Sequence, residues 1–123
     1  MPEAEAIFSF IGATFRSVWA LELLCLLRKN RPASMSNSDM VEGLTASQLV
    51  VHQSLVSLTA AGLVLVDVDG SARYAPASNS LDEMADAAVD MYANRPNAVR
   101  RIIVSSTNPS ITAFADAFRL KKD

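Results

Sequence analysis

The stretch from residue 40 to residue 76 constrains the fold of this chain most, because its pattern changes from helical to extended at one glycine. Before Gly62, the apolar residues Val51, Leu55 and Leu58 recur at the spacing of one helix face. After Gly62 comes a run rich in β-branched residues, which favour strands. Glycine readily adopts the left-handed conformation that ends many helices. We therefore expect a helix to stop at Gly62 and a strand to follow.

A β-hairpin is predicted directly after Gly62. Asp69-Gly70 is typical of a two-residue type I′ turn, which needs positive φ at both residues. This turn would join strands at Leu63–Val68 and Ala72–Ala75. Pro76 would end the second strand, because proline cannot donate a hydrogen bond to a sheet.

Two short helices are predicted within residues 38–62. Met40, Val41 and Leu44 lie at helical spacing and would end the first helix. A turn at Thr45-Ala46 would follow. Ser47 is a good N-cap for the second helix, because its hydroxyl can accept from the free N–H groups of the first turn.

This order of helix, turn, helix and two-stranded wing resembles a winged helix-turn-helix, as in bacterial transcriptional regulators of the MarR, IclR and ArsR type. Residues 47–55 are similar to the family's recognition helix, and Val51-His52-Gln53 lies at its centre. Residues 58–64 match the family's ending L-x-x-A-G-L-V. The turn carries Thr45 where the family usually has glycine. The resemblance implies a mainly α fold with a β-hairpin wing and additional N- and C-terminal helices in one domain, residues 1–123.

The remaining segments show helical periodicity. Residues 6–30 are expected to form one long helix, with Trp19 and Cys25 in the core. Residues 80–94 are expected to form another, with Ser80 as N-cap and Glu83 completing a capping box. Pro96 would open the next helix. A loop would span residues 105–109, and residues 111–121 would form a last helix. Residues 80–121 thus form a helical region in addition to the winged helix-turn-helix. Extra helices of this kind usually build the dimer in winged-helix regulators, so a homodimer is expected through the N-terminal helix, the C-terminal helices or both; the alternative is that they complete a monomeric core. The apolar residues expected at the dimer interface are Phe8, Ile11, Phe15, Met84, Met91, Phe114 and Phe118.

Composition points away from several other classes of protein. A net charge of −2 argues mildly against indiscriminate binding to phosphates. A single cysteine cannot form an intramolecular disulfide, which favours a cytoplasmic protein. The acidic N-terminus is unlike a signal peptide, and no apolar run has the length of a membrane span. One histidine and one cysteine do not form a metal site, and no phosphate-binding glycine motif occurs. We expect no enzyme, cofactor or metal. The carboxylates of residues 80–94 are interpreted as a solvated face: Asp82, Glu83, Asp86 and Asp90.

The first functional hypothesis, implied by the resemblance, is a regulator that binds double-stranded DNA. The helix at about 48–61 would enter the major groove. Gln48 or Gln53 could pair with adenine, and His52 could contact a phosphate or guanine. The expected DNA-binding residues are Ser47, Gln48, His52, Gln53, Val56 and Arg73.

The second hypothesis is a protein–protein interaction module with the same fold. From Leu44 to Pro76 the only charged residues are Asp67, Asp69 and Arg73. Apolar residues on or near the outward face of the second helix would then contact a protein: Leu49, Val50 and Val56. The position of the basic residues outside the motif separates the two hypotheses. DNA binding gains if they converge beside helix 48–61, and protein binding gains if they lie on the opposite side: Arg28, Lys29, Arg31, Arg100, Arg101, Arg119, Lys121 and Lys122.

Overall fold

The computed structural model describes residues 2–107, and it is mainly helical with one small two-stranded antiparallel sheet. The elements follow in the order α1 (Ala4–Thr14), α2 (Val18–Asn30), α3 (Asn37–Leu44), α4 (Gln48–Ala60), β1 (Val64–Val66), β2 (Ala72–Tyr74), α5 (Asn79–Asn94) and α6 (Pro96–Thr107). The expected helix at 111–121 lies outside the described residues.

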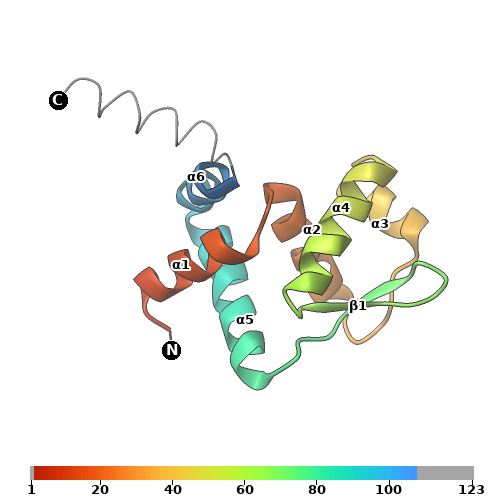
Figure 1. Ribbon diagram of the computed structural model, residues 1–123, viewed down its shortest axis with the longest axis horizontal. Helices are drawn as coiled ribbons and strands as arrows, with labels where there is room; N and C mark the ends of the chain where they lie inside the picture. Colours follow the sequence, from red (N-terminus) through yellow and green to blue (C-terminus); the bar gives the residue numbers. More distant parts are fainter. Residues whose placement is uncertain (1, 108–123) are drawn as a thin grey trace.

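Helix α2 lies at the centre of the molecule. It packs against α4, α3 and β2 on one side, while α1, α5 and α6 pack against one another on the other side (Figure 1). The largest side chains of the core have no measurable solvent exposure, and they come from both groups: Ile11, Phe15, Leu21, Leu23, Leu24, Leu27, Met40 and Leu58. One hydrophobic core therefore joins the helix-turn-helix region to the terminal helices.

The prediction of one helix over residues 6–30 is wrong. Two helices replace it, bent by 107° at residues 15–17. Phe15 has an extended backbone (φ −97°, ψ 116°) and is fully buried. The Ser17 hydroxyl then caps α2 by accepting from the Ala20 N–H at 3.2 Å. Burial of the Phe15 ring in the core and a new cap compensate for the broken helix. Within residues 2–107 no helix alone has the length and apolar composition of a membrane span; α1 and α2 pass that test only when joined across their bend.

The two helices of the motif form as predicted. Ser47 caps α4 by accepting from the Val50 N–H at 3.2 Å, and Gly62 has a φ of 76° after the helix. In the turn between α3 and α4, Thr45 adopts the left-handed conformation with a φ of 53°. A β-branched residue adopts this conformation only at a cost, which explains why glycine is favoured at such a turn.

The hairpin is confirmed, but its turn is not. Residues Val64, Leu65 and Val66 pair with Tyr74, Arg73 and Ala72. Gly70 has a φ of 89°, whereas Asp69 is not among the residues with positive φ, so the predicted type I′ turn is wrong. The Gly70 N–H donates to the Asp67 carbonyl at 2.9 Å and the Asp67 N–H to the Ser71 carbonyl at 2.7 Å. These bonds indicate a longer loop in which only Gly70 is left-handed.

A third segment, which the sequence did not indicate, pairs with the hairpin. Met35 forms an antiparallel bridge to Ala72, with N–H to carbonyl distances of 2.8 and 2.9 Å in the two directions. The free edge of β2 is thereby paired to the segment between α2 and α3. This pairing fixes the hairpin against the helical core.

Two further boundaries differ from the predictions. The N-cap of α5 is Ser78, whose hydroxyl accepts from the Leu81 N–H at 3.1 Å, so Ser80 lies inside the helix and its capping box with Glu83 does not form. Helix α6 opens at Pro96 as expected but continues to Thr107, through part of the expected loop. The cap at Ser78 lengthens α5 by two residues relative to a cap at Ser80.

Candidate interaction surface on α4 and the hairpin

Helix α4 presents its predicted outward face to solvent. Val51, Leu55 and Leu58 are buried, as their spacing indicated. All six residues proposed for DNA binding are exposed: Ser47, Gln48, His52, Gln53, Val56 and Arg73. Four of them lie on the outward side of α4, Gln48, His52, Gln53 and Val56, and Ser47 is the N-cap at the start of this helix.

Arg73 lies apart from the five residues on α4. It is the middle residue of β2, between the buried Ala72 and Tyr74, and it is paired with Leu65 across the ladder. Because side chains alternate along a strand, Arg73 and Leu65 point away from the face of the hairpin that meets the core. The structure thus separates the predicted wing contact from the helix contacts.

A groove of about 510 Å³ runs between α4 and the hairpin. His52, Val56 and Thr59 line it from the helix, and Val66 and Gly70 line it from the hairpin. Val66 was not predicted as a site residue. The sequence did contain one indication of its position. Val66 lies two residues after Val64, and residues i and i+2 of a strand share a face.

The surface around this groove is unusually apolar. Large hydrophobic side chains are exposed on both elements: Leu49 63%, Val56 57%, Leu65 49%, Val66 43% and Val68 109%. Val56 and Val66 line the groove, whereas Leu65 lies on the other face of the hairpin, as Arg73 does. Single exposed apolar residues are ordinary, but exposed apolar side chains that line one groove are typical of an interaction site. We call α4 and the hairpin with these five residues the α4–hairpin surface.

The charges of this region are mostly negative. Helix α3 and the hairpin carry four exposed carboxylates, Asp39, Glu42, Asp67 and Asp69, and α3 and α4 contain no lysine or arginine. Hydrogen bonds from the Ser71 backbone and side chain lower the pKa of the Asp69 carboxyl, which therefore stays ionised. Arg73 is the single cation of residues 37–76.

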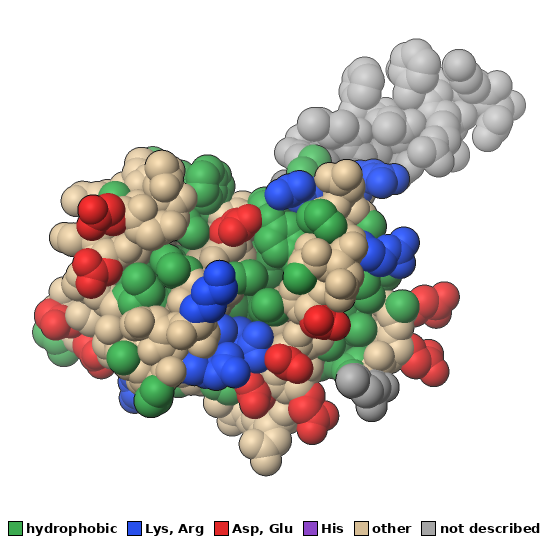
Figure 2. Space-filling model, turned by 180° about the vertical axis from the view of Figure 1, so that it is seen from behind, with side chains coloured by type: hydrophobic (Ala, Val, Ile, Leu, Met, Phe, Trp, Pro, Cys, Tyr) green, Lys and Arg blue, Asp and Glu red, His purple; other side chains and the backbone are tan. Residues whose placement is uncertain are grey.

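The basic residues at the end of α2 contact α5 and the hairpin. Arg28 pairs with Asp86 of α5 at 2.8 Å, and its guanidinium and that of Arg31 lie 5.3 and 5.9 Å from the ring centre of Tyr74. Lys29, Arg28 and Arg31 line a hollow that also contacts Val89 of α5. Figure 2, which views the molecule from behind, shows blue side chains gathered in the middle of this face.

Arg100 of α6 also lies away from α4. Its guanidinium donates to the Tyr92 hydroxyl at 3.2 Å, beside α5. Arg101 is exposed on α6, whereas Arg119, Lys121 and Lys122 lie outside the described residues. None of the lysine and arginine side chains that the structure describes lines the groove between α4 and the hairpin.

Two of the α5 carboxylates have partners, which the sequence did not indicate. Asp82 accepts from the Tyr74 hydroxyl, and Asp86 pairs with Arg28. The interpretation of these residues as a solvated face is therefore incomplete, although all four remain exposed.

In the part of the chain that the structure describes, no three histidine, cysteine or acidic residues lie together in a way that would hold a metal ion.

Comparison of the chain with family models, curated proteins and solved structures found no match.

Proposed function

We propose that this chain is a protein–protein interaction module of the winged-helix type, whose α4–hairpin surface binds an apolar and basic segment of a partner protein. The observation that supports this proposal most is the groove lined by the exposed Val56 and Val66, in a region where α3 and the hairpin carry exposed carboxylates. Apolar side chains of a partner would enter the groove beside Val56 and Val66. Lysine or arginine side chains of the partner would meet the carboxylates of α3 and the hairpin, which gives orientation more than affinity.

A phage-displayed library of random peptides, selected on the immobilised full chain, tests this proposal. Selected peptides are expected to be enriched in large apolar residues together with lysine and arginine. Their binding should be lost in Val56→Asp, which places a charge in the groove. Val104→Asp on α6 is the matched control, since Val104 is also an exposed valine on a helix. Acidic selected peptides, or equal binding by Val56→Asp, would refute the proposal.

DNA binding is the second candidate, and one observation favours it. Gln48, His52 and Gln53 are exposed near the capped N-terminal end of α4, in a helix-turn-helix followed by a hairpin. In a winged-helix regulator this end of the helix enters the major groove. Gln53→Ala would then cost roughly 1–3 kcal/mol for the preferred base pair. Arg73→Ala would weaken all sequences equally, because a phosphate contact carries no base information.

Fluorescence anisotropy with random duplex DNA at low salt tests this second candidate. Non-specific binding by proteins of this class has a Kd of about 10⁻⁴–10⁻⁶ M. No binding at protein concentrations in the tens of micromolar would remove the DNA hypothesis.

The homodimer stays a prediction. Ile11 and Phe15, two residues expected to contribute to its interface, are fully buried within the chain, while Phe8, Met84 and Met91 are half-buried. Phe114 and Phe118 lie outside the described residues. Light scattering at tens of micromolar should give the dimer mass, and a monomer mass would refute the prediction.

A further inference from the structure

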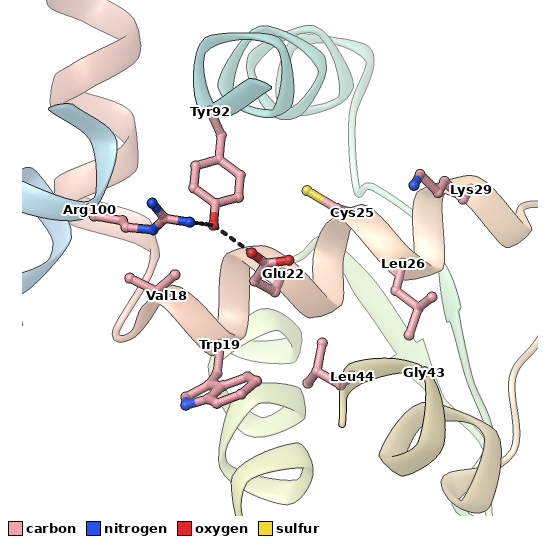
Figure 3. Close-up of a pocket in the computed structure, with 10 residues that line it drawn as sticks. All are labelled: Val18, Trp19, Glu22, Cys25, Leu26, Lys29, Gly43, Leu44, Tyr92 and Arg100. Carbon is pink, nitrogen blue, oxygen red and sulfur yellow. Dashed lines mark hydrogen bonds between the residues drawn. The ribbon is translucent and has the colours of Figure 1, made fainter. Parts of the chain in front are cut away.

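The outer face of α2 forms a hollow that neither candidate function uses. It has a volume of about 420 Å³ and opens between α2, the end of α3, and helices α5 and α6 (Figure 3). Along α2 it extends from Trp19 to Lys29. We call it the α2 hollow.

One wall of the α2 hollow is polar, and its side chains already form hydrogen bonds with one another. The Tyr92 hydroxyl donates to the Glu22 carboxylate, and Arg100 donates to the same hydroxyl (Figure 3). Burial and then the bond to Glu22 raise the pKa of Tyr92, so the hydroxyl keeps its proton. Among residues 2–107, Glu22 is the only carboxylate that lines the hollow, and it accepts the hydrogen bond from Tyr92.

The opposite wall is apolar. Trp19, predicted to lie in the core, is 43% exposed instead, and Leu26 and Leu44 continue this wall towards α3. Gly43 allows the close approach, because a Cβ atom there would lie 2.9 Å from Leu26 Cδ2. A large exposed indole beside leucines offers a surface for an apolar ligand.

A second, basic hollow adjoins the first. It has a volume of about 430 Å³ and shares Cys25 and Lys29 with the α2 hollow, while Arg28 and Arg31 supply two more cations. The Arg28 side chain is 9% exposed and bonds to Asp86, but its Nε is buried without a partner among the described residues. Arg28 and Arg31 also line a neighbouring hollow with Asp82, Glu83 and Asp86, so Lys29 and Arg31 are the cations of the basic hollow that are most available to an anionic group.

The α2 hollow has the length of an extended alkyl chain, and the basic hollow adjoins one end of it. At the rise of an α-helix, Trp19 and Lys29 lie about 15 Å apart along α2, which an extended alkyl chain of about ten to twelve carbons would span. The apolar end is at Trp19 and the cationic end is at residues 28–31. A rounder ligand would leave one of the two hollows empty.

We propose that the paired hollows bind a linear acyl carboxylate, with its carboxylate among Arg28, Lys29 and Arg31 and its chain along Trp19 and Leu26. Ligand pockets typically combine apolar walls with a few charged groups that fix orientation, which is the arrangement here. None of the residues that line these two hollows lines the groove between α4 and the hairpin, so the two sites can be tested separately.

The chain itself carries a reporter for this proposal, because Trp19 is its only tryptophan. Titration of the full chain with sodium dodecanoate, below its micelle concentration, should change the tryptophan emission in a saturable way. Three control ligands should each bind more weakly than dodecanoate. Dodecanol has no charge, dodecyltrimethylammonium has the opposite charge, and butyrate lacks the long alkyl chain.

A charge-reversed variant tests the orientation of the ligand. Lys29→Glu combined with Arg31→Glu changes two exposed side chains and should weaken dodecanoate binding by about tenfold or more, as expected for lost charge-assisted hydrogen bonds. Arg73→Glu on the hairpin is the control and should leave the affinity unchanged.

Three results would overturn the proposal. The first is equal binding of dodecanoate and dodecyltrimethylammonium, and the second is unchanged affinity in the charge-reversed variant. The third is a response to phosphatidylglycerol vesicles without any response to dodecanoate, because that would indicate a membrane surface rather than a single acyl anion.

Discussion

Replacement of Thr45 by glycine should stabilise this protein. Thr45 is the one non-glycine residue with positive φ within residues 2–107, at 53°. The left-handed conformation costs a residue with a Cβ roughly 1–2 kcal/mol. Thr45 offers little in return, because its hydroxyl lies 3.5 Å from the Glu42 carbonyl in an exposed position, at the limit of a hydrogen bond.

Glycine removes this strain but has its own cost. It increases the conformational entropy of the unfolded chain, which lowers stability by roughly 0.4–1 kcal/mol. The difference leaves an expected gain of about 0.5–1 kcal/mol for Thr45→Gly. Urea unfolding followed by circular dichroism should show a higher midpoint with an unchanged slope m, because the buried surface is the same.

Thr59→Gly is the matched control for this substitution. Thr59 is an exposed threonine inside α4, where glycine is the less favourable helix former. Its midpoint should therefore fall slightly. If Thr45→Gly also lowers the midpoint, the left-handed conformation of Thr45 is not a source of strain, and the reasoning fails.

Three further outcomes follow from buried groups. Phe15→Ala should destabilise the fold by about 3–5 kcal/mol in urea unfolding, because a fully buried ring at the bend leaves a cavity. Burial, and next the nearby Glu22 carboxylate, raises the pKa of the Cys25 thiol from 9.0 to about 11. At pH 8 its thiolate fraction is then about a hundredth of that of an ordinary thiol, so iodoacetamide should label the native chain far more slowly than the urea-unfolded chain. Burial and the bond to Asp82 raise the pKa of Tyr74 from 10.0 to about 12. Its contribution to stability is fully present below pH 10 and is lost as the pH rises towards 12, so Tyr74→Phe should flatten the alkaline fall of the urea midpoint.

The sequence predicted those features of the fold that depend on local chemistry. The cap at Ser47, the stop at Gly62 and the buried face of α4 each follow from residues within a few positions of one another. The break at residues 15–17 did not follow, because the apolar period continues through it. Ile11, Phe15 and Val18 are all apolar, so the pattern of one helix and that of two are alike.

The sequence also predicted those parts of the candidate site that depend on local periodicity. Exposure of the six proposed residues follows from helix and strand periodicity. The groove beside Val66 and the bridge from Met35 to Ala72 join segments far apart in the chain, and no local pattern indicates them. Trp19 was placed in the core because large apolar residues usually lie there, whereas the packing of α3 leaves it at the rim of the α2 hollow.

The separation of charge across α2 allows salt dependence to locate any DNA binding that is observed. Each phosphate neutralised on duplex DNA contributes about −0.9 to the slope of log K against log salt. Arg73 is the one cation on the hairpin and α4, so DNA bound by that surface should show a slope near that of one contact. A slope several times steeper would require cations outside that surface, such as those at the end of α2 or on α6. If the cations at the end of α2 are responsible, Lys29→Glu with Arg31→Glu should abolish binding and Gln53→Ala should leave it unchanged, which would assign the DNA contact to a surface other than the helix that resembles a recognition helix.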